Sequence, residues 1–310
     1  MANITAAMVK ELREMTGAGM MDCKKALGET DGDMDAAVEF LRKNGQAKAE
    51  KKAGRIAAEG LCKVIVKDDK TAAVVEVNSE TDFVAKNEEF QNFVAAVAEQ
   101  AINSDAADMD AFLSESWNQD SSKTVKDALV EKVAKIGENL SIRRFEKVTA
   151  EHGLVVSYTH GGGRIGVIVE ADTDVVNDAI KEAMTNVAMQ IAALSPKYVS
   201  TADVSEEYKA HEKEILMAQI ANDPKMAGKP DQVLAKIAEG KVGKYYKENC
   251  LLEQEFVKDG SMNVQKYVDS VAKKLGADIK VTAFIRYAKG EGLEKKEENF
   301  ADEIANMVKG

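Results

Sequence analysis

An internal repeat constrains the fold of this chain more than any other feature of its sequence. Gly60-Leu61 opens a β-rich run that turns back on itself, and Gly153-Leu154 opens a second run of the same kind. Each run has segments rich in β-branched residues on both sides of a turn, which predicts a β-hairpin. A helix follows each hairpin, and a later helix ends at glycine just before a third strand. We infer that one ancestral unit was duplicated. The predicted strands are residues 62–66, 72–77, 140–145, 155–159, 165–169 and 279–284.

The repeat predicts an α+β fold with two three-stranded antiparallel sheets, each covered by helices. The two halves occupy residues 56–150 and 151–292. The second half is longer because it contains an insertion, roughly 204–249, in which apolar residues recur at helical spacing on both sides of a proline-containing turn. This pattern predicts a projecting helical hairpin, which could carry self-association of the chain. Residues 293–310 form a C-terminal module, predicted to be an amphipathic helix.

Residues 1–45 are predicted to form three short helices, a small bundle of the ubiquitin-associated type. Thr5 can cap the first helix, and the second helix begins near Met20. Asn44-Gly45 is typical of a helix end and predicts the end of the third helix. Residues 46–55 follow with several lysines and little apolar content. Such a charge run indicates a charged linker between the bundle and the core.

The charge balance of the chain is acidic. Of 310 residues, 53 are Asp or Glu and 42 are Lys or Arg, which gives a formal net charge of −11. Proteins that bind phosphate backbones use Lys and Arg, so this balance argues against nucleic acid as a direct partner. The apolar runs are too short to span a membrane, and residues 1–10 lack the pattern of a signal peptide. Three widely spaced cysteines fit a reducing compartment, so we expect a cytoplasmic location.

Known motifs for catalysis or cofactor binding are not found in the sequence. There is no phosphate-binding GxxxxGK[ST] loop, and Gly17-Ala18-Gly19 fits a turn between helices. His160-Gly161-Gly162-Gly163 resembles an oxyanion loop, but no GxSxG nucleophile motif accompanies it, and a hairpin turn explains the glycines. The histidines do not show metal-ligand spacing. We therefore expect no catalytic residue, no metal and no cofactor, and we expect His160 to be a surface contact.

Residues 78–84 (Asn-Ser-Glu-Thr-Asp-Phe-Val) are open to two interpretations. In the first, Thr81 or Asp82 caps the following helix and Phe83 packs into the core as a hydrophobic staple. In the second, Asp82 and Phe83 form an exposed loop tip that offers a charge and a bulky aromatic side chain to another protein. The local pattern alone favours the first. The second half carries only Ala-Asp-Thr-Asp (171–174) at the corresponding junction, without a comparable phenylalanine, and this difference favours the second.

Several ordered motifs, spread over nearly the whole chain, resemble those of the elongation factor Ts family. Any one of them would be weak, but the combination is specific. The motifs are residues 12–27, 54–60, 81–85, 160–166, 195–198 and 290–292. There are small departures: Ser79 stands where the family often has cysteine, and Gln254-Glu255-Phe256 lacks a proline that many relatives carry.

The resemblance implies guanine-nucleotide exchange on the translational GTPase elongation factor Tu, with no cofactor and no bond-making chemistry. It also implies that a short segment of this chain intrudes between helices of the GTPase and disturbs its Mg²⁺ site. The implied partner contacts are Thr81, Asp82, Phe83 and Val84 at the Mg²⁺ site, Arg13, Met20 and Met21 on the GTPase domain, and His160 on a neighbouring domain. The last helix would lie along the GTPase surface.

Two other functions stay open from the residues alone. The chain could be an adaptor, in which a ubiquitin-associated-like domain is joined to a dimerising α+β core without any effect on a nucleotide. It could also be a small-molecule enzyme whose site follows no known motif. Release of labelled GDP from elongation factor Tu separates the exchange factor from the adaptor, and binding screens with common metabolites address the enzyme.

Overall fold

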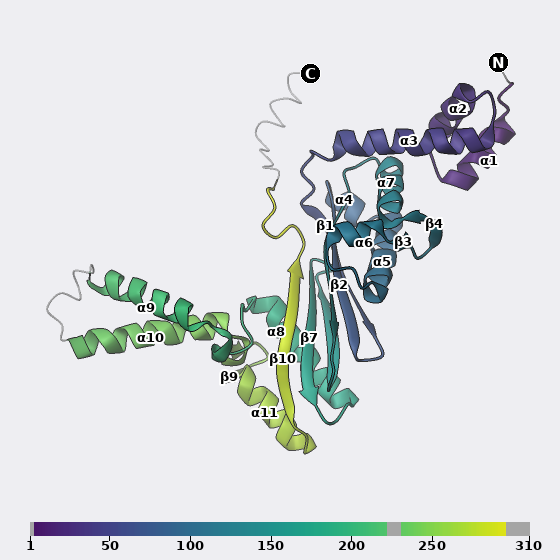
Figure 1. Ribbon diagram of the computed structural model, residues 1–310. Helices are drawn as coiled ribbons and strands as arrows, with labels where there is room; N and C mark the ends of the chain where they lie inside the picture. Colours follow the sequence, from purple (N-terminus) through teal and green to yellow (C-terminus); the bar gives the residue numbers. More distant parts are fainter. Residues whose placement is uncertain (1–2, 222–230, 296–310) are drawn as a thin grey trace.

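The computed structural model describes residues 3–221 and 231–295 of the chain. Its N-terminal part is a bundle of three helices, as the sequence predicts (Figure 1). Thr5 and Asp33 cap the first and third helices with their side chains. Buried residues from all three helices form a core that belongs to the bundle alone. The helices are α1 (Ala6–Thr16), α2 (Met20–Glu29) and α3 (Met34–Lys52).

The third helix is longer than the sequence predicts. The predicted end at Asn44-Gly45 is wrong, because α3 continues to Lys52 and includes most of the charged segment 46–55. Gly45 is buried, and a Cβ added there would lie 3.6 Å from the Cβ of Ala134 in α7 (Val125–Ile136). This glycine therefore permits two helices to approach closely and does not end one of them.

The first half of the core is a three-stranded antiparallel sheet in the order β1-β2-β5. Helices cover one face of this sheet, and Phe90, Phe93, Val94 and Val97 are buried between them and the sheet. The elements are β1 (Glu59–Lys67), β2 (Thr71–Ser79), α5 (Glu88–Asn103), α6 (Met109–Ser114), α7 (Val125–Ile136) and β5 (Ser141–Thr149).

The second half repeats this arrangement, with strands in the order β10-β7-β6 and helices on one face. Ile180, Met184, Val187 and Ile191 of the first of these helices are buried against the sheet. The elements are β6 (Leu154–His160), β7 (Ile165–Thr173), α8 (Asp178–Leu194), α11 (Val264–Leu275) and β10 (Ile279–Ala288). The α+β class and every predicted strand are confirmed.

The two sheets pack face to face, which the sequence did not predict (Figure 1). A separate cluster of buried side chains fills the space between them, with Val64 and Val74 from the first sheet and Val155 and Ile168 from the second. The central strand β2 is therefore buried along nearly its whole length. The core consists of four layers, with helices outside and two sheets inside.

Gly166 of β7 packs against the first sheet, and it supports a stability prediction. A Cβ added there would lie 2.9 Å from Val64 Cγ2 and 3.3 Å from Val74 Cγ2. We expect Gly166→Ala to lower the free energy of unfolding by about 1–3 kcal/mol, the usual cost of overpacking a filled core. Chemical denaturation measures this change. Gly28→Ala, in α2 with nothing within 4 Å of the new methyl group, is the control and should not destabilise the protein.

A small two-stranded hairpin precedes the last helix of each half, and the sequence analysis missed both. A buried glutamine holds each hairpin. Gln100 donates to the Ser116 carbonyl oxygen at 3.3 Å and accepts from the Asn118 N–H at 2.9 Å. Gln190 makes the same pair of contacts with Glu255 and Val257, at 3.0 and 2.8 Å. The strands are β3 (Ser116–Trp117), β4 (Asp120–Thr124), β8 (Glu255–Phe256) and β9 (Asp259–Asn263). The repeat thus extends to individual polar contacts.

Two long helices project from the second half as a pair (Figure 1). They are α9 (Glu206–Ala221) and α10 (Asp231–Asn249), and they form the predicted insertion. Short 3₁₀ turns at Thr201–Asp203 and Leu251–Glu253 lead into and out of the pair. The predicted turn between the helices, at 222–230, and residues 296–310 of the predicted C-terminal helix lie outside the described residues.

Candidate partner-binding site

A one-turn helix, α4 (Asp82–Ala85), follows β2 and carries the segment that the sequence singles out. Thr81 is its N-cap, and Thr81 Oγ1 accepts a hydrogen bond from the Val84 N–H at 3.3 Å. On the inner side of the helix, Ala85 is buried and Val84 packs against the core of the first half. These contacts fix one side of α4 to the protein.

Phe83 lies on the outer side of α4. It is 80% exposed, so the interpretation of Phe83 as a core staple is wrong, whereas Thr81 as the helix cap is confirmed. Asp82 Oδ2 and Lys86 Nζ form an ion pair at 2.6 Å, and Lys86 Nζ lies 5.9 Å from the centroid of the Phe83 ring. The hydrogen bond from Lys86 holds the pKa of the Asp82 carboxyl below its ordinary value. The helix therefore presents a bare aromatic ring next to a charged carboxylate.

The helix α4 is an addition to the scaffold that the two halves share. In the second half, residues 174–176 join β7 to Asn177, which caps α8. In the first half, residues 80–86 join β2 to Asn87, which caps α5 in the same way. The longer connection contains α4. Because one half folds without this turn of helix, the common architecture does not require it.

The N-terminal bundle exposes a second apolar surface around the α1–α2 turn. Met20 is 60% exposed and Met21 is 73% exposed, and Arg13 and Met15 beside them are also exposed. Gly17 takes a left-handed conformation that ends α1 and brings the start of α2 next to its end. Methionines exposed in this way form an adaptable apolar surface of the kind that proteins use to bind partners.

A cleft of about 450 Å³ separates this turn from α7. Met15 and residues 17–19 line one side of it, and Lys126 and Val130 of α7 line the other. The bundle is fixed across the cleft by an ion pair of 2.9 Å between Arg42 and Asp127 and by the contact of α3 with α7.

His160 is exposed at the end of β6, where Tyr158 Oη lies 3.0 Å from its Nδ1. The turn after it, with three glycines in left-handed conformations, is packed against the first half. The Cys62 N–H donates to the Gly163 carbonyl oxygen at 2.7 Å, and a Cβ on Gly163 would lie 2.7 Å from Leu61 Cδ2. The glycines therefore fit this turn against β1.

The predicted contact residues fall into two groups in space. The turn after His160 lies against the start of β1, and Glu59 at this start pairs with Ser79, which precedes α4. His160 and the segment 81–84 therefore lie at the same end of the stacked sheets. Arg13, Met20 and Met21 form the other group on the bundle, which is attached to the first half through α3 and α7.

Comparison with known proteins identifies the family. A family model described as "Elongation factor TS" matches residues 80–291. Elongation factor Ts of Clostridium tetani (strain Massachusetts / E88) is 51% identical over 306 residues, which cover 98% of this chain and 99% of the relative. Elongation factor Ts of Clostridioides difficile (strain 630) is 52% identical over 310 residues, the full length of both chains. The chain belongs to the elongation factor Ts family. The resemblance found in the motifs is confirmed, and the family name supports a role in translation elongation.

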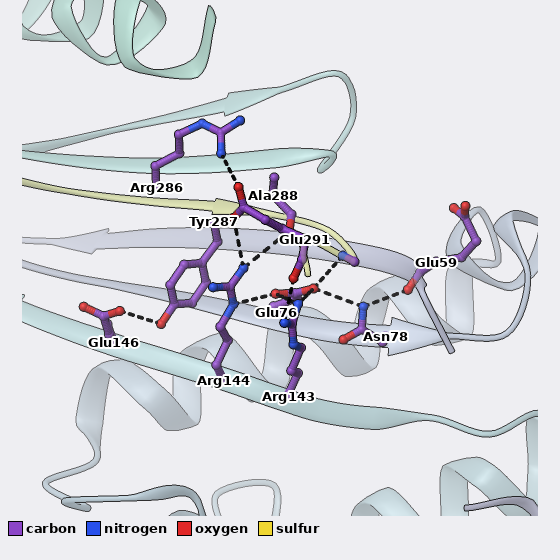
Figure 2. A network of polar contacts seen from close by, with 11 residues as sticks. Glu59, Glu76, Asn78, Arg143, Arg144, Glu146, Arg286, Tyr287, Ala288 and Glu291 are labelled. Atoms are coloured by element: carbon purple, nitrogen blue, oxygen red, sulfur yellow. Dashed lines mark hydrogen bonds and ion pairs between the residues drawn. The ribbon is translucent and has the colours of Figure 1, made fainter. Parts of the chain in front are cut away.

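The segment that follows β10 also joins the two halves of the core. It contacts the buried carboxylate of Glu76 in the first half (Figure 2). Among residues 3–221 and 231–295, Glu76 is the one charged residue that is fully buried, at 0% exposure. Its carboxylate accepts hydrogen bonds from the Gly290 N–H at 2.7 Å, Arg144 Nε at 2.6 Å, Arg143 Nη1 at 3.0 Å and Asn78 Nδ2 at 3.1 Å. Burial alone would raise the pKa of this carboxyl, but the hydrogen bonds outweigh burial and hold the pKa below its ordinary value.

Further contacts around Glu76 fix the chain where it leaves the second half (Figure 2). Arg143 Nη2 donates to the Glu291 carbonyl oxygen at 2.7 Å, and the Arg144 guanidinium lies 4.0 Å from the centroid of the Tyr287 ring. Lys289 pairs with Glu59. The elongation factor Ts motif at 290–292 is thus held against the first sheet, close to the strand end that leads into α4.

The described residues contain no group of three or more His, Cys, Asp or Glu side chains that could hold a metal ion. Across residues 3–221 and 231–295, no helix is long and apolar enough to cross a membrane. The three cysteines are buried free thiols, and burial raises the pKa of Cys62 to about 12.

Two acidic residues around this candidate site were not found from the sequence. One is Glu76, and the other is Glu138, which hydrogen-bonds to Thr81. A single glutamate inside an apolar strand could have pointed to Glu76, because such a carboxylate must find partners when buried. A residue-by-residue comparison of the two halves could have pointed to Glu138.

Proposed function

We propose that this protein is a guanine-nucleotide exchange factor that binds elongation factor Tu–GDP and promotes release of GDP, so that GTP can bind. The observation that carries the proposal is the 80% exposure of Phe83 on a helix whose other side is fixed to the core. Leaving a large aromatic side chain in water is unfavourable unless a partner covers it, and aromatic anchors dominate the energetics of protein interfaces.

In this proposal, the segment Thr81–Val84 intrudes between helices of the GTPase and disturbs its Mg²⁺ site. We call this segment the wedge. Phe83 supplies its bulk, and Asp82 supplies a carboxylate that Lys86 keeps charged. Displacement of Mg²⁺ removes the largest local charge that opposes the phosphates, so the affinity for GDP falls. If this protein binds the nucleotide-free GTPase more tightly than the GDP-bound form, linkage requires that it weaken the binding of GDP by the same ratio.

The remaining contacts position the wedge. Arg13, Met20 and Met21 would bind the GTPase domain through the exposed surface of the bundle, and His160 would bind a neighbouring domain. Exchange by this route makes and breaks no covalent bond, so the protein needs no catalytic residue and no cofactor of its own. The proposal also places the protein in the cytoplasm, where translation occurs, with the helical pair α9–α10 available for self-association.

The test measures release of fluorescent GDP from elongation factor Tu, with excess unlabelled nucleotide, at increasing concentrations of this protein. We expect release to accelerate to a plateau and the affinity for GDP to fall by about 5–150-fold, the usual range of coupling between two sites. Binding to the GTPase without any acceleration at saturation would contradict the proposal and support the adaptor.

A further inference from the structure

Glu138 holds the start of α4 from a distant part of the chain. It lies in the loop between α7 and β5, and its carboxylate accepts three hydrogen bonds. Glu138 Oε1 accepts from Thr81 Oγ1 at 2.7 Å, and Glu138 Oε2 accepts from the N–H groups of Glu80 and Thr81, both at 3.1 Å. Charge-assisted hydrogen bonds of this kind are stronger than neutral ones.

These contacts fix the helix cap itself. Because Thr81 donates its hydroxyl hydrogen to Glu138, a lone pair on Thr81 Oγ1 is available for the Val84 N–H. A single turn of helix is unstable alone, since the first turn fixes many dihedral angles for few hydrogen bonds. The orientation of α4 therefore depends on such outside contacts.

The same two loops are also joined in the opposite direction. Glu80 Oε1 accepts from the Asn139 N–H at 2.6 Å and pairs with Arg55 at 3.3 Å. The second half retains this contact at the equivalent place, where Asp174 accepts from the Asp278 N–H at 3.4 Å. The contact between residues 80 and 139 thus belongs to the scaffold that both halves share.

Glu138 does not belong to that scaffold. Gly137 and Gly276 end the last helix of their halves, so the residue equivalent to Glu138 is Ala277. The second half has neither this carboxylate nor a helix like α4, and yet it folds into the same sheet and helices. Within this chain, Glu138 occurs in the half that has the wedge and is not needed for the fold that both halves share.

We propose that Glu138 is a positioning residue that orients α4, and thereby Phe83, for nucleotide exchange. The effect on exchange rests on the proposed function, but the effect on α4 does not. In Glu138→Ala, the wedge remains attached through Val84 and Ala85 but loses its fixed cap. In Glu138→Gln, the amide oxygen can accept the two N–H groups and the amide nitrogen can donate to Thr81 Oγ1, so the orientation is retained.

The first measurement uses the free protein and needs no GTPase. Hydrogen exchange of the Lys86 amide, which donates to the Asp82 carbonyl oxygen, reports on α4. We expect Glu138→Ala to accelerate this exchange at least about tenfold, while the amide of Val97 in α5 stays protected. Glu138→Gln should remain close to the unsubstituted protein. Unchanged exchange at Lys86 in Glu138→Ala would overturn the proposal.

The second measurement is GDP release from elongation factor Tu. Glu138→Ala should lower the plateau rate about tenfold, with the half-saturating concentration changed less than about twofold, since the bundle still binds the GTPase. In a Phe83→Ala background, Glu138→Ala should add almost nothing, because both changes act through the same side chain. Asp174→Ala, which removes the scaffold contact in the half without a wedge, is the matched control. It should promote GDP release at the normal plateau rate.

The two measurements separate the two proposals. If Glu138→Ala speeds hydrogen exchange at Lys86 but the unsubstituted protein does not accelerate GDP release from elongation factor Tu, the proposed function is disproved. The role of Glu138 in holding α4 then stands. Normal GDP release with a full plateau rate in Glu138→Ala would disprove the role of Glu138 in exchange. An additive effect in the Phe83→Ala background would show that Glu138 acts through the general fold, and would also overturn the proposal.

Discussion

Replacement of Phe83 by alanine should slow GDP release from elongation factor Tu by roughly thirtyfold or more, because interface anchors of this kind contribute at least about 2 kcal/mol. The fold should be unaffected, since Phe83 is 80% exposed. We expect the free energy of unfolding to change by less than about 0.5 kcal/mol, as is usual for surface substitutions. Stopped-flow release of fluorescent GDP and urea denaturation provide the two measurements.

Phe90 offers a matched control seven residues further along the chain. It is a phenylalanine at the start of α5, but it is fully buried in the core of the first half. Phe90→Ala should cost about 3–5 kcal/mol of stability, as truncation of a core aromatic does. If Phe83→Ala instead behaved like Phe90→Ala, with lost stability and a proportionate loss of activity, Phe83 would be a structural residue in solution.

The strands and the repeat could be predicted from the sequence because their evidence is local. Strands such as β1 and β7 combine β-branched residues with nearby glycines, and this local pattern is enough to predict each strand. The repeat then multiplies this information, since a hairpin that is ambiguous in one half is supported by its counterpart. The cap at Thr5 is equally local and was also found.

The arrangement of the parts could not be predicted in this way, because it depends on residues far apart in the sequence. Gly45 fits the sequence pattern of a helix end, but its place in the middle of α3 makes sense only beside Ala134, 89 residues away. Gly166 has no local meaning, and its role appears only when the two sheets are stacked. In both cases a glycine provides space for a distant neighbour, and no pattern within either helix or strand records that neighbour.

The candidate site shows the same division. The sequence around Phe83 fits a buried staple as well as an exposed wedge, because both begin with the same helix cap at Thr81. The difference between the two halves favours the wedge, and the exposure of Phe83 excludes the staple. Glu138 and Glu76 were not found at all, since their partners Thr81 and Gly290 are 57 and 214 residues away in the sequence.

Glu76→Ala should destabilise this protein strongly. The substitution leaves Arg143 and Arg144 without their carboxylate and leaves the Gly290 N–H without an acceptor. Removing one partner of a buried ion pair costs about 3–5 kcal/mol, and because the two arginines are partly exposed we expect about 3 kcal/mol. Glu170→Ala, at the equivalent position of β7, is the control; its carboxylate makes no hydrogen bond or ion pair with the residues that the structure describes, so little loss is expected.

The dependence of this effect on pH tests whether charge is its cause. The pKa of Glu76 is depressed in the folded protein from its ordinary value of 4.5, so the carboxylate stabilises the fold above that pH and loses this contribution as the pH falls through the lower folded-state pKa. The difference in unfolding free energy between the unsubstituted protein and Glu76→Gln, which resembles the protonated acid, should be constant above pH 4.5 and shrink below it. A difference that does not change with pH would mean that Glu76 stabilises the junction by shape alone. In that case the hydrogen bonds to Gly290 and the arginines would not depend on the charge of the carboxylate, and the pKa of Glu76 would not be depressed by them.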